Sequence, residues 1–274
     1  MSNKQNIQTQ QANTETNDFC PVDAVVGLPT INVNEITLGD SLELCERIPA
    51  KTVDLILEDM PYNTTACEWD VKIDLELYWK TRLRILKPTG AIVLTASQPF
   101  TTILASSNLG MLKYEWIWNK KLAGNGILAH YQPLKIHENI LVFGKTIKYY
   151  PVKRKGVYRA KGGIKDEHGT FSNAASDITY NDEYYPESII EFSGAGLRND
   201  REHPTQKPVG LFEYLIRTYS NENDLVFDGF GGSGTTAIAA HKSKRNFIVI
   251  EKEQKYFDLA TRRLDDERRQ LSLL

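Results

Sequence analysis

Two short loops hold the residues best suited to chemistry, and the first reads Asp59-Met60-Pro61-Tyr62. The carboxylate of Asp59 and the backbone carbonyl of Met60 could each accept one N–H from an exocyclic amine of a nucleic-acid base. Two such acceptors would free the nitrogen lone pair for in-line attack on a methyl group. Pro61 bends the loop, and Tyr62 could stack on a base that has left its helix. The loop alone could also be an ordinary turn.

The second loop runs from Asp228 through Gly-Phe-Gly-Gly-Ser-Gly-Thr-Thr, and Glu251 follows about 20 positions later. Glycines let a backbone approach a nucleoside cofactor closely, and a later acidic residue can accept hydrogen bonds from the ribose hydroxyls. The spacing also satisfies G-x-G-x-x-G, so a dinucleotide-dependent oxidoreductase is an alternative. A Walker loop is excluded, because no lysine follows the last glycine. A charged Asp228 at the mouth of the loop would favour the ammonium or sulfonium of S-adenosylmethionine over a pyrophosphate.

Each loop follows an apolar segment that reads as a buried strand, 53–57 for the first and 225–227 for the second. Further strands are predicted at 36–38, 91–95, 114–118, 140–143 and 247–250, and helices at 75–86, 209–219, after Gly234 and from Gln254. Lys87-Pro-Thr-Gly is expected to be the turn that closes the first of these helices. This alternation predicts a doubly wound α/β fold with a mostly parallel, Rossmann-like sheet, and both loops at the carboxyl ends of strands.

Residues 145–165 interrupt the alternation with eight lysines and arginines, no acidic residue and interleaved tyrosines. This composition suits phosphate contacts and stacking on bases, although a solvated surface loop is the simpler reading. The sequence therefore predicts an insertion in which Lys153, Arg154, Lys155 and Arg159 are candidates for nucleic-acid contacts.

The composition is that of a folded protein of 274 residues, 41% hydrophobic, with a net charge of −2. Nucleic-acid affinity must therefore come from a local basic patch. No apolar run reaches the roughly 18 residues of a membrane span, and the polar segment 1–30 reads as a flexible tail without a secretory signal. The three cysteines form no C-x-x-C pair and the five histidines show no ligand spacing, so no metal is expected. We expect a cytoplasmic protein with one catalytic domain at 31–274.

Together the two loops resemble those of the DNA amino-methyltransferases, which pair an (Asp/Ser/Asn)-Pro-Pro-Tyr loop with a Phe-x-Gly-x-Gly loop. Their order, with the basic insertion between them, resembles the permuted beta group of that family. The resemblance extends over about 36–264 and includes further matching segments at Gly39-Asp40, Trp118-Asn-Lys120, His137-Glu-Asn and His203-Pro-Thr-Gln-Lys-Pro208. Two positions depart from the family pattern, since Met60 and Gly229 stand where proline is usual.

The resemblance implies S-adenosylmethionine as the cofactor, double-stranded DNA as the partner and flipping of the target base. It also implies that the insertion is a target-recognition region at about 145–196, in which Lys153, Arg154, Lys155 and Arg159 contact DNA. By position, the methionine half of the cofactor would lie on Asp228, Phe230, Gly232 and Gly234. The resemblance likewise places Thr205 and Lys207 near the cofactor carboxylate, Glu251 at the ribose and Asp40 near the cofactor adenine.

Asp at the head of the first loop resembles the adenine-N6 enzymes, whereas Ser is commoner in the cytosine-N4 enzymes. The adenine-N6 enzymes belong to restriction-modification systems or act alone. Cytosine-N4 methylation, an RNA or protein-amine methyltransferase and a non-catalytic DNA-binding relative remain alternatives. Cytosine-C5 chemistry is disfavoured, because no cysteine follows a proline. Homodimers occur in the group, so a homodimer is a further expectation.

Overall fold

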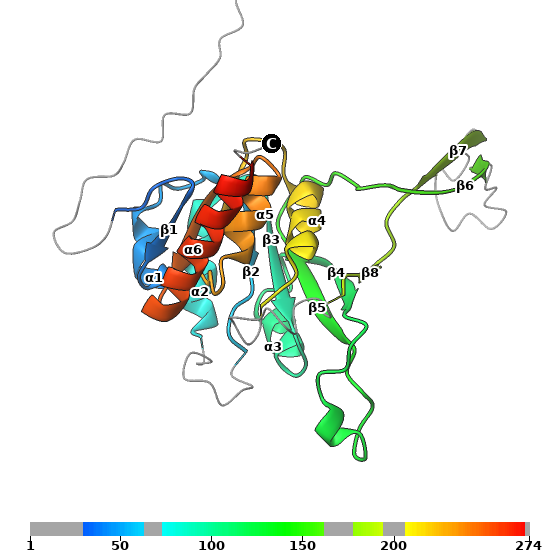
Figure 1. The fold of residues 1–274 in the computed structure, drawn as a ribbon, viewed down its shortest axis with the longest axis horizontal. Coiled ribbons are helices and arrows are strands. Elements are labelled where there is room, and N and C mark those ends of the chain that lie inside the picture. Colours follow the sequence, from blue (N-terminus) through cyan, green and yellow to red (C-terminus); the bar gives the residue numbers. More distant parts are fainter. Residues whose placement is uncertain (1–29, 63–72, 162–177, 194–205, 272–274) are drawn as a thin grey trace, which may run out of the picture.

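A computed structural model describes residues 30–62, 73–161, 178–193 and 206–271. Its centre is a sheet of eight strands in the order β1-β10-β9-β2-β3-β5-β4-β8 (Figure 1). The strands are β1 (Glu35–Leu38), β2 (Val53–Glu58), β3 (Leu86–Ala96), β4 (Leu112–Asn119), β5 (His137–Phe143), β8 (Ile189–Glu191), β9 (Leu225–Asp228) and β10 (Asn246–Glu251). Of these strands only β5 runs against its neighbours, so the predicted mostly parallel sheet is confirmed.

Helices cover both faces of this sheet. On one face lie α4 (Val209–Tyr219), α5 (Thr235–Lys242) and α6 (Gln254–Leu271), and on the other α1 (Ser41–Leu44), α2 (Leu75–Ile85) and α3 (Phe100–Ser107). Strand β2 shows why two layers are needed, because all six of its residues are buried. Leu55 and Leu57 pack toward α4 and α5, while Ile56 between them packs toward α1 and α2. Successive side chains of a strand point to opposite faces, so a continuous apolar run requires cover on both.

Two of the helices, α1 and α2, begin at an aspartate cap. Asp74 caps α2, its side chain accepting the N–H groups of Glu76 and Leu77 at 3.0 and 3.1 Å. Asp40 caps α1 by accepting the N–H of Leu42 at 2.9 Å. Such caps satisfy N–H groups that have no partner within the helix. None of the described helices is both long and apolar enough to cross a membrane.

The expected turn at Lys87-Pro-Thr-Gly is wrong, because α2 ends at Ile85 and β3 begins at once with Leu86. The register of β3 against β2 shifts in this segment, from Val53↔Leu86 to Leu55↔Ala91. Gly90 allows the close approach, since a Cβ there would lie 2.8 Å from the Asp54 carbonyl oxygen. Helix α3 was not predicted from the sequence.

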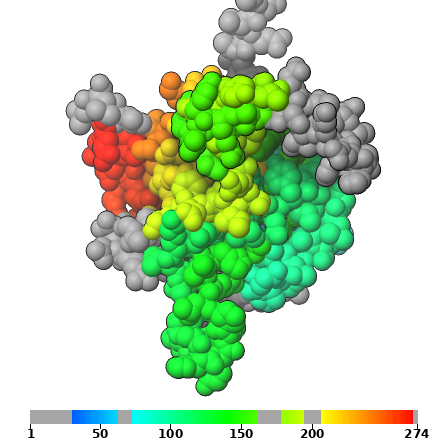
Figure 2. Space-filling view, turned by 90° about the vertical axis from the view of Figure 1, so that its right-hand side faces the viewer, coloured from blue at the N-terminus to red at the C-terminus, as the bar shows by residue number. Residues whose placement is uncertain are grey.

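Part of the predicted insertion projects from the body as an antiparallel pair, β6 (Arg154–Lys161) and β7 (Thr179–Tyr184) (Figure 1). We call the described residues 152–161 and 178–187 the arm. The ends of the predicted 145–196 region belong instead to the body. Ile147 packs on the core beside α4, and β8 pairs with β4 at the sheet edge through Ile117↔Ile189. Figure 2 is viewed from the side on which the arm projects, so the arm lies in front of the body in that view.

Candidate active site

The two loops predicted from the sequence lie next to each other at one edge of the sheet. Strands β2 and β9 pair in parallel through Leu55↔Val226 and Ile56↔Phe227. Asp59, just after β2, and Asp228, the last residue of β9, therefore lie at neighbouring carboxyl ends. From this pair the chain winds outward in opposite directions, to β3 on one side and β10 on the other. This is the switch point of an open α/β sheet, where ligands bind in such folds.

The carboxylate of Asp59 is held by three side chains. Lys207 donates to Oδ2 at 2.6 Å, the Tyr62 hydroxyl donates to Oδ1 at 2.7 Å, and the Thr95 hydroxyl also donates to Oδ1. The Asp59 side chain keeps 20% of its surface exposed, whereas that of Lys207 keeps 8%. The carboxylate is therefore fixed in orientation and still reaches the surface of the site.

Behind Asp59 the charges alternate in a chain. Lys207 also lies 3.4 Å from Glu138 Oε2, and Lys120 lies 3.0 Å from Glu138 Oε1. Burial opposes ionisation of both central groups. Even so, Asp59 and Glu138 hold the pKa of Lys207 above its usual value, and the two lysines hold the pKa of Glu138 below its own. Lys207 and Glu138 are thereby kept charged.

Tyr62 does not stand free in the site. Its ring stacks on Phe100, with centroids 5.4 Å apart and planes at 24°, and its hydroxyl lies 2.9 Å from that of Thr95. Burial, together with the Asp59 charge, raises the pKa of Tyr62 well above its usual value. The phenol therefore stays protonated and available as a hydrogen-bond donor.

Met60, one of the two departures from the family pattern, contributes its side chain to the core. It is 1% exposed and belongs to the apolar cluster beneath α1 and α2. Its role in the expected chemistry needs only the backbone carbonyl, which every residue has.

The Asp228 carboxyl lies inside the protein and not at the mouth of the loop, where its charge was expected. The side chain is buried, with Oδ1 accepting the Phe230 N–H at 2.8 Å and Oδ2 accepting the Thr236 hydroxyl. Burial and the nearby Glu58 raise the pKa of Asp228 to about 8. Because this carboxyl is mostly neutral at pH 7 and faces its own loop, its charge does not select the cofactor from the mouth of the loop. The carboxyl instead holds the conformation of the loop through its hydrogen bonds with Phe230 and Thr236.

The glycines that follow leave room for a close neighbour. A Cβ at Gly231 would lie 2.6 Å from Val249 Cγ1, and one at Gly234 would lie 2.9 Å from Ala260 Cβ. Gly232 and Gly234 have φ of 51° and 76°, a backbone conformation that side chains disfavour.

Glu251 and Asp40, at the ends of β10 and β1, lie beside this loop. Glu251 accepts the N–H groups of Gly232 at 2.6 Å and Glu253 at 2.8 Å. Each carboxylate oxygen has a second lone pair for a hydroxyl. Asp40 is paired with Lys252 at 3.1 Å, and the Gly39 N–H donates to the Glu251 carbonyl at 2.9 Å. The loop and these two carboxylates thus form a cradle whose hydrogen-bonding groups suit a nucleoside cofactor.

The ammonium of Lys207, which was expected near the cofactor carboxylate, lies on Asp59 and Glu138. Its carbonyl oxygen accepts the Thr235 hydroxyl at 3.3 Å, so the residue bridges the two loops. Thr205 and His203 lie outside the described residues. Sequence reasoning missed Thr95, Glu138 and Lys120 as members of the site. The segments containing Lys120 and Glu138 were noted only as resemblance, and the pairing of β4 with β5 through Trp118↔Glu138 brings them together.

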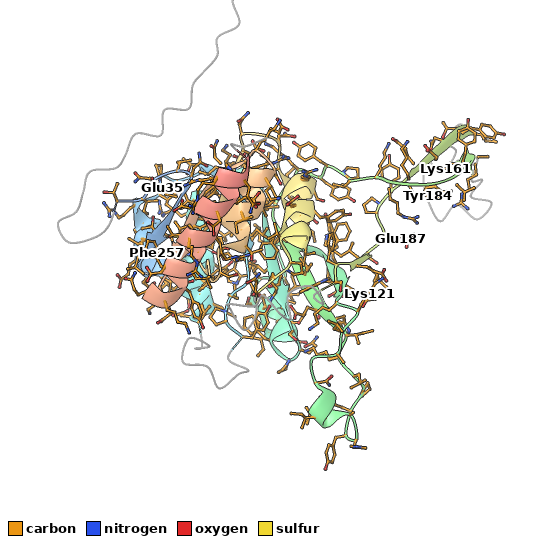
Figure 3. The ribbon with its side chains drawn as sticks, in the orientation of Figure 1. Glu35, Lys121, Lys161, Tyr184, Glu187 and Phe257 are labelled. Carbon is orange, nitrogen blue, oxygen red and sulfur yellow. The ribbon has the colours of Figure 1, made fainter. Side chains whose placement is uncertain are left out.

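On the arm, three of the four predicted DNA contacts already have acidic partners. Lys153 pairs with Glu183 at 2.9 Å, Arg154 with Glu187 at 2.6 Å and Lys155 with Asp182 at 3.0 Å. The Arg159 guanidinium lies 5.0 Å from the Tyr184 ring centre, and Lys161 is close to the same ring (Figure 3). The patch that is purely basic in sequence is thus partly neutralised in space.

Comparison with known proteins identifies the class. The DNA methylase family profile for N6 and N4 methyltransferases matches residues 53–262, and the chain belongs to this family. DNA adenine methyltransferase YhdJ of Escherichia coli is 32% identical over 244 residues, covering 83% of this chain and 81% of that protein. Type II methyltransferase M.HpaI of Haemophilus parainfluenzae is 27% identical over 249 residues, covering 84% and 73%.

Solved structures agree. The complex of M1.HpyAVI with S-adenosylmethionine superposes with a TM-score of 0.58 at 25% identity, covering 84% of this chain and 99% of that one. The cytosine-N4-specific PvuII DNA methyltransferase has the same fold, with a TM-score of 0.58 at 18% identity and coverage of 86% and 91%. The protein is thus a DNA methyltransferase of the N6/N4 family, with S-adenosylmethionine as its cofactor. Among the described residues no His, Cys, Asp and Glu side chains are grouped as metal ligands.

Proposed function

We propose that this chain methylates the exocyclic N6 of adenine in a base flipped out of double-stranded DNA. The observation that carries the proposal is the Asp59 carboxylate, oriented by Lys207 and Thr95 at the switch point beside the cofactor loop. The aspartate at the head of the catalytic loop favours adenine over cytosine. YhdJ, the relative at 32% identity, is named a DNA adenine methyltransferase.

In this proposal the chain's own groups activate the amine. Asp59 and the Met60 carbonyl each accept one N–H of the target amine. The nitrogen then becomes more tetrahedral, and its lone pair is free from conjugation with the ring. When bound, S-adenosylmethionine supplies the electrophilic methyl group. As the C–S bond breaks and the C–N bond forms, the amine loses one proton toward Asp59. Tyr62 stacks on the base.

The cofactor is assigned to the cradle of Phe230, Gly232, Gly234 and Glu251, with Asp40 at its adenine. Asp228 supports the methionine half by shaping the loop. Lys207, expected near the cofactor carboxylate, is assigned mainly to Asp59. Thr205 keeps its expected place there as a proposal.

The test is transfer of labelled methyl from S-adenosylmethionine to unmethylated genomic DNA, followed by nucleoside analysis. We expect N6-methyladenine, and a loss of about 10²-fold or more in Asp59→Ala, because a preorganised polar contact in the transition state is removed. The Asp59→Ala protein must retain cofactor binding, which serves as its folding control. N4-methylcytosine would overturn the base assignment while keeping the reaction. Methylation that survives Asp59→Ala would overturn the catalytic assignment.

A further inference from the structure

An ion pair with no exposed surface lies beneath the two loops. Arg82 of α2 and Glu58 at the end of β2 are both 0% exposed, with Nε and Oε1 2.9 Å apart. The Tyr78 hydroxyl donates to the other carboxylate oxygen at 2.6 Å. None of these groups belongs to the proposed reaction.

Glu58 connects the catalytic loop to the cofactor loop directly. It immediately precedes Asp59, and its Oε1 also accepts the N–H of Gly229 at 2.9 Å. Gly229 immediately follows Asp228. One carboxylate oxygen therefore joins the first residues of both loops across the β2–β9 boundary.

Arg82 extends the connection to a third segment. Its Nη2 donates to Ser41 Oγ at 3.0 Å and its Nη1 to Cys45 Sγ at 3.1 Å. Ser41 follows Asp40, which is proposed to approach the cofactor adenine. The Arg82 guanidinium thus contacts both Glu58, which joins the two loops, and Ser41, which adjoins the segment at Asp40.

The second departure from the family pattern is explained by this pair. A Cβ at Gly229 would lie 2.3 Å from Arg82 Nη2 and 2.9 Å from Glu58 Oε1, so a side chain has no room. Proline, the usual residue in the family, would also lack the N–H that Glu58 accepts. In this chain the Arg82–Glu58 pair therefore requires glycine at 229.

Stability alone is a weak reason for such a pair, since buried ion pairs are often no better than apolar residues of the same volume. We propose that Arg82 and Glu58 are positioning residues, which set cofactor affinity by holding the Gly229 N–H and hence the spacing of the two loops. The inference rests on the proposed placement of the cofactor on the 228–236 loop.

Two double variants separate positioning from stability. Arg82→Met/Glu58→Gln removes both charges but keeps a carbonyl that can accept the Gly229 N–H, whereas Arg82→Met/Glu58→Leu removes the acceptor as well. The Kd for S-adenosylmethionine is measured by calorimetry beside each Tm. We expect the Gln variant within about threefold of the wild type and the Leu variant at least tenfold weaker, since a bond to a buried N–H is removed. In steady state, the KM for cofactor should rise in the Leu variant more than kcat falls.

Asp54 provides a matched control at the opposite end of the same strands. Its Oδ2 accepts the Leu225 N–H at 3.1 Å and pairs with Lys87 at 2.7 Å. Asp54→Leu/Lys87→Met should lower the Tm and leave the cofactor Kd unchanged.

Equal cofactor affinity in the Gln and Leu double variants would overturn the inference. Should the Leu variant fail to fold, Gly229→Ala takes its place, because the added methyl pushes against Arg82 and Glu58 while both charges remain. Weaker cofactor binding in Gly229→Ala supports the inference, and unchanged binding overturns it. A wild-type protein that binds cofactor but methylates no base contradicts the proposed function alone, because this test reads cofactor affinity.

Discussion

The hydroxyl and the ring of Tyr62 have different roles at the site. Its hydroxyl now holds Asp59, while the proposed reaction uses its ring against the target base. Tyr62→Phe keeps the ring and removes a competitor for Asp59, so methylation should remain within a few-fold of the wild type. Tyr62→Ala should lose about 5- to 150-fold in DNA methylation, since stacking on a base is worth about 1–3 kcal/mol. Steady-state methylation of the same DNA by both variants measures the difference, and equal loss in both would argue that the hydroxyl is the essential group.

Met60 separates stability from chemistry, because its side chain is in the core and only its carbonyl is proposed to act. Met60→Ala should reduce the free energy of unfolding by about 2–5 kcal/mol, the usual cost of emptying such a site. Methylation per folded molecule should be retained at a temperature well below the Tm. Denaturant unfolding beside single-turnover assays checks both statements. A Met60→Ala protein of normal stability but low activity would contradict this assignment.

Asp228 predicts a pH dependence of stability. Its pKa rises from an ordinary value near 3.8 to about 8 in the fold, so between these values the folded state binds more protons than the unfolded one. Its contribution to stability is then greatest below about pH 4 and is lost progressively as the pH rises to 8. In Asp228→Asn, the free energy of unfolding should fall less steeply between pH 5 and 8 than in the wild type. Urea titrations of both proteins at several pH values measure this. If the carboxyl were ionised throughout, the free energy of unfolding would change with pH equally in both proteins.

At the scale of elements, the arm combines cations with their own counter-charges. Asp182→Asn/Glu183→Gln releases Lys153 and Lys155 for phosphates, and should tighten DNA binding at low salt. Neutralising Lys153, Arg154 and Lys155 should weaken DNA binding and reduce its salt slope by up to about 0.9 for each phosphate that the arm no longer neutralises. Cofactor affinity should not change in either variant. Binding isotherms at several salt concentrations test this, and a simultaneous loss of cofactor affinity would place the arm in the catalytic core.

The sequence was sufficient for elements with a clear period or cap, such as α2 and the buried strand β2. It was insufficient for α3, which has no capping side chain, and for β6 and β7, which have few buried residues to create a pattern. The two loops were predicted because their residue types are unusual. Glu58 and Arg82 were not, because a buried charge looks like a surface charge until its partner, 24 positions away, is known.

At the scale of the molecule, the doubly wound architecture could be predicted because alternating strands and helices allow few topologies. The position of the recognition region could be predicted only in part. Its ends pack on the body through Ile147 and β8, and this packing depends on residues far apart in the sequence. Within the described part of the predicted region, only the arm projects from the body (Figure 1).

The pairing of β2 with β9 also governs how the protein is made. Leu55 and Val226 are adjacent in the sheet, although 171 positions separate them along the chain. During synthesis β2 therefore has an unpaired edge until β9 has left the ribosome. Such non-local pairing slows folding and leaves hydrophobic strands exposed meanwhile. The strand edge at which the candidate active site forms is thus also one that stays unpaired in the nascent chain and is open to aggregation.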